Sequence, residues 1–166
     1  MGDTYKEILI KRETPAGKKV LKGLMIALTA LCIFFGIVIW PFLIAGVALL
    51  VACYFFVPKF DVEFEYLYVN GELDIDAIYS KQRRKKMGSY DVSELEILAP
   101  ANSHALDSFR NQKGLKVKDF TSLDPHAKSY ILIVNKEKGR EMIKVELEDS
   151  ILTDLRRLAP RKVNLY

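Results

Sequence analysis

The sequence has little cysteine, and this scarcity limits the chemistry that the chain can perform. Its only two cysteines, Cys32 and Cys53, both lie inside a long apolar stretch. A disulfide framework needs paired cysteines in a part of the chain that meets an oxidising solvent, so none is expected. A metal site needs three or four clustered ligands, and the two histidines, His104 and His126, stand alone. We therefore predict no metal and no other cofactor.

Recognisable catalytic motifs are also missing. No G-x-S-x-G sequence accompanies either histidine, and the nine glycines form no phosphate-cradling loop. These absences predict a protein that is not an enzyme and has no catalytic residues. A membrane hydrolase that uses His104 or His126 is the weakest alternative. Residues 59–166 carry 19 basic and 18 acidic side chains, a balance that argues against nucleic acid as a partner.

Charge is absent from the 36 residues between Gly23 and Pro58. One helix of that length would run about 54 Å, whereas the hydrocarbon core of a bilayer is about 30 Å thick. Trp40-Pro41 lies midway, and proline suits the first turn of a new helix. We therefore predict a two-helix transmembrane hairpin over residues 18–58 with a break at 40–41.

Alternatives to a spanning hairpin stay open. The halves are short enough for a re-entrant hairpin that does not cross fully. Leu50-Val51-Ala52-Cys53 resembles a bacterial lipobox, but the apolar run before it is too long for a signal peptide. Small residues form one stripe on each helix, which predicts close helix contact. The two stripes are Gly23, Ala27 and Ala30, and Ala45, Ala48 and Ala52.

Lysine flanks the apolar stretch on both sides, at Lys22 and Lys59. Cytoplasmic flanks of membrane helices carry such an excess of basic residues. We therefore predict that residues 1–17 form a cytoplasmic N-terminal tail. Residues 59–166 should form a cytoplasmic β domain, so that both termini lie in the cytoplasm.

Residues 60–79 have the pattern of a β-hairpin, because Asn70-Gly71 is a favoured two-residue turn between alternating strands. One face of this hairpin is apolar and the other is acidic. The predicted apolar face consists of Val62, Phe64, Tyr66, Tyr68, Leu73, Ile75, Ala77 and Tyr79.

A basic run follows the acidic strands, and it is the candidate binding site of the sequence. It contains Lys81, Arg83, Arg84, Lys85 and Lys86. As a third strand over residues 83–90, the run would neutralise the acidic strand beside it. Alternatively, it binds anionic lipid or a partner near the membrane. Both readings stay open, since alternate residues of a strand point to opposite faces.

Short strands and one closing helix make up the rest of the β domain. Alternating or β-branched residues predict strands over 93–99, 114–120, 130–135 and 141–147, with a short helix over 102–109. Ile151, Leu155 and Leu158 share one face of a C-terminal helix over 150–158, which Pro160 ends.

Three segments carry a family resemblance that covers nearly the whole chain. They resemble an uncharacterised family of small clostridial-type membrane proteins with a bacterial PH-like domain. The segments are the run from Phe64 to Asp76, Arg83-Arg84-Lys85-Lys86, and the closing Ala159-Pro160-Arg161-Lys162-Val163. The resemblance implies an α+β membrane protein of the bacterial cell membrane. Its N-terminal transmembrane helical hairpin would be followed by a PH-like antiparallel β-barrel or roll with a C-terminal helix.

The predicted function is that of a non-enzymatic, membrane-anchored interaction module. It would bind membrane lipids with an anionic surface, a partner protein, or a second copy of itself in a homo-oligomer. The alternative is an accessory subunit of a larger membrane complex, held there through its hairpin.

Overall fold

The computed structural model describes residues 4–110, 112, 114–137 and 139–165. The chain forms two compact units. The hairpin unit consists of Glu13–Glu63 and Ile78–Arg84, and the sheet unit consists of Met1–Arg12, Phe64–Ala77 and Lys85–Tyr166. The boundary between the two units falls within three of the strands.

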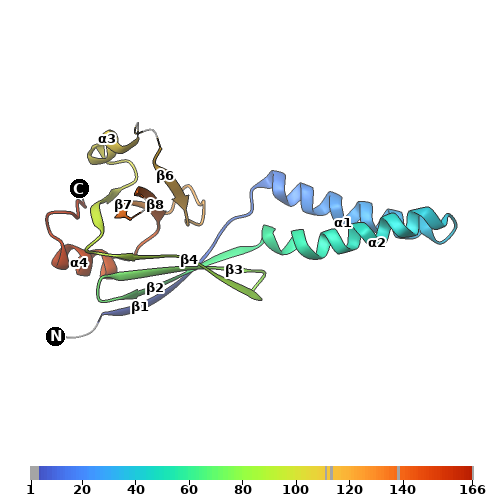
Figure 1. The fold of residues 1–166 in the computed structure, drawn as a ribbon, viewed down its shortest axis with the longest axis horizontal. Helices are drawn as coiled ribbons and strands as arrows, with labels where there is room; N and C mark the ends of the chain where they lie inside the picture. The colour runs from blue at the N-terminus through green and yellow to red at the C-terminus, as the bar shows by residue number, and fades with distance from the viewer. Residues whose placement is uncertain (1–3, 111, 113, 138, 166) are drawn as a thin grey trace. The chain divides into compact units, whose positions relative to one another are not determined.

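The hairpin unit contains the two long apolar helices. Helix α1 spans Ala16–Gly36 and helix α2 spans Trp40–Phe56, followed by the 3-10 helix η1, Val57–Phe60. The two helices lie side by side and antiparallel (Figure 1). The break lies at residues 37–39, just before the predicted 40–41, because Pro41 takes its place in the first turn of α2.

Two glycines allow the helices to approach closely. A Cβ atom added to Gly46 would lie 2.9 Å from Cγ1 of Ile33, and one added to Gly36 would lie 2.6 Å from the backbone nitrogen of Leu43. The predicted stripe on α1 faces elsewhere: a Cβ on Gly23 would meet nothing within 4 Å, and Ala27 is exposed. The spacing of small residues did not identify the glycines that lie at the contact.

Within the described residues, eight strands form two four-stranded sheets. The first sheet has the order β1-β2-β3-β4, with β1 Tyr5–Lys11, β2 Val62–Val69, β3 Glu72–Tyr79 and β4 Arg83–Asp91. The second has the order β5-β7-β8-β6, with β5 Leu95–Pro100, β6 Lys116–Asp119, β7 Tyr130–Lys136 and β8 Gly139–Val145. Strand β6 is parallel to β8, and the pairs β5–β7 and β7–β8 are antiparallel.

Strand β1 lies in the segment that we predicted to be a tail, and that part of the prediction is wrong. Tyr5–Lys11 forms the edge strand beside β2, although β2 begins fifty residues later in the chain. Only Ile10 of this strand is buried, so its sequence lacks the alternation by which a strand is recognised. The helical hairpin is therefore inserted between two neighbouring strands of one sheet.

The two sheets do not close into the predicted barrel. Side chains instead satisfy backbone carbonyls at the sheet edges: Arg12 donates to the oxygen of Asp119 at 2.9 Å, and Tyr66 Oη donates to that of Phe120 at 2.8 Å. On β4, Lys136 Nζ donates to the oxygen of Ser89 at 2.8 Å. Period-two alternation predicts which face of a strand is buried, but it does not specify which edges pair.

The core of the sheet unit follows the predicted apolar face. Asn70 and Gly71 have φ angles of 46° and 98°, as the turn between β2 and β3 requires. Six of the eight predicted residues are buried, while Val62 and Tyr79 are half-buried. Helix α4, Asp149–Leu158, buries Ile151, Leu152 and Leu155. The described short helices are η2, His104–Leu106, and α3, Asp107–Arg110.

Candidate functional site

The two units differ in charge. The hairpin unit has seven basic and three acidic residues, whereas the sheet unit has eighteen of each. The whole net charge of +4 therefore belongs to the hairpin unit.

The charges of the helices gather at one end of the hairpin, which we call its base. Lys18, Lys19 and Lys22 lie in the first turns of α1, and Lys59 lies in η1, after α2. Because the helices are antiparallel, the start of α1 and the end of α2 meet at this base. The ammonium group of Lys59 lies 4.8 Å from the centre of the Phe56 ring, in cation–π geometry.

The turn between β3 and β4 belongs to the same base. The backbone nitrogen of Ser80 donates to the oxygen of Asp61 at 2.8 Å, and its hydroxyl donates to the oxygen of Pro58 at 3.3 Å. Thr14, just before α1, donates to the oxygen of Phe60 at 2.7 Å. These bonds hold the strand turn against the end of η1, so that its basic residues join those of the helices. We call the resulting set the basic collar: Lys18, Lys19, Lys22, Lys59, Lys81, Arg83 and Arg84.

This turn has an unusual backbone for its sequence. Ser80 and Lys81 have φ angles of 47° and 57°, and the nitrogen of Gln82 donates to the oxygen of Tyr79 at 3.1 Å. A two-residue turn with positive φ at both central positions favours asparagine and glycine, the pair at Asn70-Gly71. A lysine in the left-handed region costs about 1 kcal/mol or more relative to glycine.

Two interpretations of the predicted basic run were left open: neutralisation of the acidic strand, and binding of anionic lipid or a partner. In the structure, different residues of the run fit each of them. Lys86 Nζ lies 3.0 Å from a carboxylate oxygen of Asp74 on β3, so this lysine neutralises the acidic strand. Burial opposes the ionisation of Asp74, but hydrogen bonds from Ser89 and Lys86 and the charge of Lys86 outweigh it and lower the pKa of Asp74. Arg84 also has an interaction partner.

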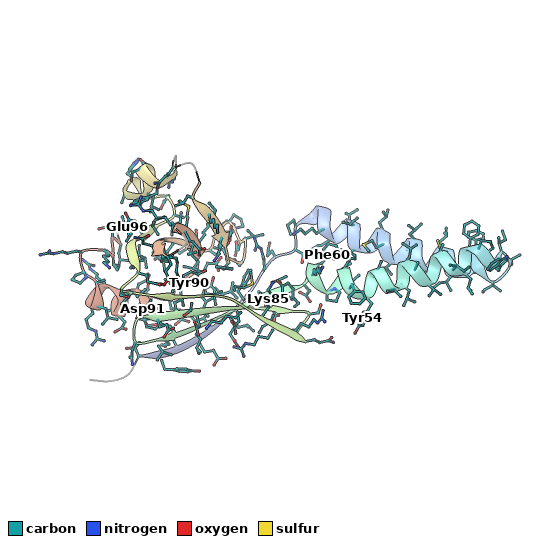
Figure 2. All side chains as sticks on the ribbon, in the orientation of Figure 1. Tyr54, Phe60, Lys85, Tyr90, Asp91 and Glu96 are labelled. Carbon is teal, nitrogen blue, oxygen red and sulfur yellow. The ribbon has the colours of Figure 1, made fainter. Side chains whose placement is uncertain are left out.

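The other three residues of the run remain available for a ligand. Lys81, Arg83 and Lys85 are exposed, and none forms an ion pair or side-chain hydrogen bond with any residue that the structure describes. Lys85 lies on β4 (Figure 2), in the sheet unit, whereas Lys81 and Arg83 lie in the hairpin unit. Lys86 and Arg84 therefore interact within the chain, while Lys81, Arg83 and Lys85 provide exposed cations in both units.

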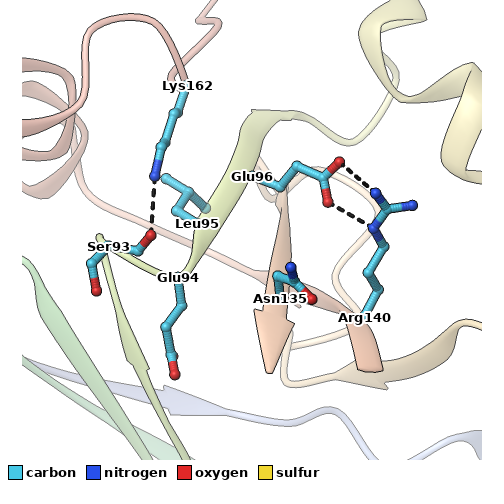
Figure 3. A pocket seen from close by; sticks show the side chains of 7 residues that line it. All are labelled: Ser93, Glu94, Leu95, Glu96, Asn135, Arg140 and Lys162. Carbon is cyan, nitrogen blue, oxygen red and sulfur yellow. Dashed lines mark hydrogen bonds and ion pairs between the residues drawn. The ribbon is translucent and has the colours of Figure 1, made fainter. Parts of the chain in front are cut away.

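One hollow in the sheet unit is lined by charged side chains whose interactions lie within the chain. It has a volume of about 570 Å³ (Figure 3). The guanidinium of Arg140 binds both carboxylate oxygens of Glu96, with Nε at 2.8 Å and Nη2 at 3.1 Å. Lys162 Nζ donates to the backbone oxygen of Ser93 at 3.1 Å. These interactions connect β5 to β8, and the segment just before β5 to the C-terminal segment, which is a structural role.

A second hollow, of about 460 Å³, surrounds Tyr90. Lys118 Nζ lies 2.7 Å from Glu141, and Lys136 pairs with Glu94. Burial raises the pKa of Tyr90, while the pKa of Lys118 is raised because its bond to Glu141 outweighs the effect of burial. Each of the two lysines already has a carboxylate partner, so this cluster also joins the strands.

The histidines are not brought together into a catalytic arrangement. Both are exposed, and His104 Nδ1 lies 3.1 Å from Asp107 in the neighbouring turn of its own segment. No group of three or more metal-ligating side chains occurs within the described parts of the chain.

The sequence did not reveal the collar as one surface. In the sequence, Lys22 and Lys59 were recognised only as flanks of the apolar stretch. These lysines lie near Lys81 because of the hydrogen bonds that Ser80 forms, and no sequence pattern predicts those bonds. The one signal of this surface in the sequence is the Ser80-Lys81 turn, because a two-residue β-turn without asparagine or glycine is uncommon.

Comparison with known proteins places the chain in a family. Neither the comparison with curated proteins nor that with solved structures found a similar protein. The family model described as Bacterial PH-like domain (DUF6106) matches residues 2–165, which include both apolar helices as well as the two sheets and α4. The chain therefore belongs to this bacterial PH-like domain family.

Proposed function

We propose that this protein is a non-enzymatic, membrane-anchored PH-like interaction module whose basic collar contacts anionic lipid head groups. One observation carries the proposal: the entire net charge lies in the hairpin unit, and the charged residues of its helices lie at one end of an apolar hairpin. In a bilayer, the basic collar would lie at the level of the anionic head groups, and the apolar helices would lie in the hydrocarbon core.

The dimensions and exposure of the helices support an anchor that spans the bilayer. Ala16–Gly36 and Trp40–Phe60 contain 21 residues each, or about 31 Å of helix, close to the thickness of about 30 Å that a bilayer core presents. Their apolar side chains project outward (Figure 2), and Tyr54, for example, is 75% exposed. In water, such a continuous apolar surface would drive aggregation, whereas lipid tails would cover it.

The strand order supports a common side for the two termini. Because β1 pairs with β2, the chain enters the hairpin and leaves it at neighbouring strands of one sheet. The segments before and after the anchor must then lie on the same side of the membrane. Lysine at the base of the hairpin favours the cytoplasmic side of the bacterial cell membrane for both termini and for the sheet unit.

Each exposed cation near an anionic bilayer contributes about 1 kcal/mol of attraction at low salt. The proposal can be tested with the full-length chain in vesicles that contain a spin-labelled lipid. Electron paramagnetic resonance then measures how strongly phosphatidylglycerol, relative to phosphatidylcholine, associates with the protein. We expect a preference for the anionic lipid that weakens as salt rises, because salt screens exposed charges.

A matched pair of double variants identifies the surface responsible. Lys59→Ala with Arg83→Ala removes two charges from the collar, and Lys116→Ala with Lys128→Ala removes two exposed charges from the sheet unit. The collar pair should lose most of the preference for phosphatidylglycerol, while the control pair should keep it. Equal association of both lipids with the unmodified protein would refute the proposal.

The second candidate function is that of an accessory subunit in a membrane complex. The outward stripe of small residues on α1 favours it, because Gly23 and Ala27 are not used in the contact with α2. Extraction in mild detergent followed by affinity purification tests this function. Co-purification of a stoichiometric partner that is lost in Gly23→Leu would support it, and recovery of the chain alone under every condition would exclude it.

A further inference from the structure

We infer that Lys81 is the residue through which the β3–β4 turn binds the phosphate of an anionic glycerophospholipid. The inference rests on the proposed function and deepens it, since it assigns a binding role to one member of the basic collar. Three observations carry it: the backbone conformation of Lys81, the attachment of its turn to the hairpin base, and the lack of an internal partner for its side chain.

The two tight turns of the first sheet differ at the position where glycine is favoured. Between β2 and β3 this position is Gly71, with φ of 98°, and between β3 and β4 it is Lys81, with φ of 57°. A side chain in this region is strained, whereas glycine is not. The turn between β3 and β4 therefore carries a lysine at a position where the fold alone would favour glycine.

The turn is fixed in place at the base of the hairpin. Ser80 holds it through the two hydrogen bonds to the oxygens of Asp61 and Pro58, on the segment that follows α2. If the hairpin spans the bilayer, its base lies at the level of the head groups, and the neighbouring Lys81 lies there too. The strained position thus places an ammonium group where lipid phosphates are found.

No interaction within the described chain accounts for this lysine. Its side chain is exposed and has no ion pair or side-chain hydrogen bond among those residues, in contrast to Lys86, which binds Asp74 at 3.0 Å. An exposed cation without a partner does not offset backbone strain. Since the described residues offer no compensating interaction, we assign it to a lipid: an ammonium group at head-group level meets phosphate oxyanions there.

The test uses three full-length variants in vesicles of phosphatidylcholine and phosphatidylglycerol. Lys81→Gly removes the charge and relaxes the backbone, Lys81→Arg keeps both the charge and the strain, and Lys128→Gly removes an exposed lysine of the sheet unit as a control. Spin-labelled lipid reports the association of phosphatidylglycerol, and thermal unfolding in detergent reports stability. Inorganic phosphate at millimolar concentration serves as a competitor.

We expect opposite changes in the two measurements for Lys81→Gly. Association of phosphatidylglycerol should fall about fivefold, the equivalent of about 1 kcal/mol for one lysine at the surface, while the thermal midpoint stays level or rises. Lys81→Arg should retain lipid association, and Lys128→Gly should leave it unchanged. Inorganic phosphate should not compete, because a single lysine recognises phosphate only at the bilayer surface.

The outcomes separate the inference from the function on which it rests. If Lys81→Gly keeps full association while the Lys59→Ala and Arg83→Ala pair loses it, the inference is wrong and the proposed function stands. If Lys81→Gly lowers both stability and association, Lys81 has a structural role and the inference is also overturned. If the unmodified protein shows no preference for phosphatidylglycerol, both fail. Competition by inorganic phosphate would instead indicate a soluble anion as the ligand.

Discussion

The hairpin unit and the sheet unit arrange the same kinds of side chain in opposite ways. In the hairpin unit, apolar side chains point outward, the helices meet at the glycines Gly36 and Gly46, and basic residues outnumber acidic ones by four. In the sheet unit, apolar side chains fill the interior, and charged residues of both signs are equal in number.

The difference is what the proposed membrane anchor predicts, with lipid around the hairpin unit and water around the sheet unit. Water favours burial of apolar area, so the sheet unit keeps its aromatic and branched side chains inside. Lipid gives no such drive, so helices in a bilayer associate through close packing at small residues. The following predictions test this contrast, beginning with the largest expected effect.

The close approach at Gly46 should be the most sensitive point of the hairpin. In Gly46→Leu, the added atoms would meet Ile33 at 2.9 Å and the backbone of Cys32 at 3.3 Å, so the helices must separate. We expect a loss of about 3 kcal/mol, because overpacking against backbone cannot be relieved by a rotamer change. Thermal unfolding in detergent measures it. Gly23→Leu is the control, since that site is open; an equal loss in both variants would contradict the packing described.

The hydrogen bond between Tyr68 and Asp154 should be the matching sensitive point of the sheet unit. Tyr68 Oη donates to Asp154 at 2.7 Å, and Arg157 lies 2.6 Å from the other carboxylate oxygen. Tyr68→Phe should lower the free energy of unfolding by about 2 kcal/mol, since a buried charged acceptor loses a donor. Tyr5→Phe, which removes an exposed hydroxyl bonded to Glu7, should change it by less than about 0.5 kcal/mol. Similar losses in the two variants would contradict this assignment.

Alkaline pH should destabilise the sheet unit through its buried tyrosines. Burial raises the pKa of Tyr66 and of Tyr68 above the ordinary value of 10.0, and the bond to Asp154 raises that of Tyr68 further. The folded state thus keeps protons that the unfolded state releases, so stability is present below pH 10 and falls as pH rises above it. Thermal midpoints between pH 9 and 11.5 should show the fall. Tyr68→Phe should reduce the slope, and an unchanged slope would contradict the account.

The smallest effect should distinguish the two neighbouring lysines of β4. Lys86→Ala removes the ion pair with Asp74 and should lower the free energy of unfolding by about 0.5 kcal/mol, whereas Lys85→Ala should leave it unchanged. The contribution of the pair should decrease in acid, as pH falls through the lowered pKa of Asp74 in the folded state, because protonation of this carboxylate ends the attraction. Chemical unfolding at pH 7 and pH 3 measures both. A loss with Lys85→Ala of the same size would contradict the division of the run.

The sequence predicted the elements whose pattern is local. Absence of charge between Gly23 and Pro58 indicated the apolar helices, and Asn70-Gly71 with its alternating flanks indicated the first strand pair and its buried face. The C-terminal helix was also visible in its apolar spacing; it begins at Asp149, one residue before the predicted start. The resemblance to the PH-like family agreed with the match of the family model.

The features that were missed depend on contacts between distant segments. Strand β1 is defined by its pairing with β2 across the inserted hairpin, and only Ile10 of that strand is buried. The sheet edges stay unclosed where side chains bind their backbone carbonyls; Arg12, for example, donates to the oxygen of Asp119, more than a hundred residues later in the chain. The basic collar depends on Ser80. No local pattern encodes these contacts, so composition and periodicity could not predict them.

The central claim is that the hairpin spans the membrane with its base and the sheet unit on the cytoplasmic side. Labelling by a membrane-impermeant maleimide in intact cells tests it directly, with Cys32 and Cys53 first replaced by serine. Trp40→Cys, next to the tip of the hairpin, should then react from outside the cell. Lys128→Cys, in the sheet unit, should react only after the membrane is permeabilised. Labelling of Lys128→Cys in intact cells, or protection of Trp40→Cys from the outside, would contradict the account.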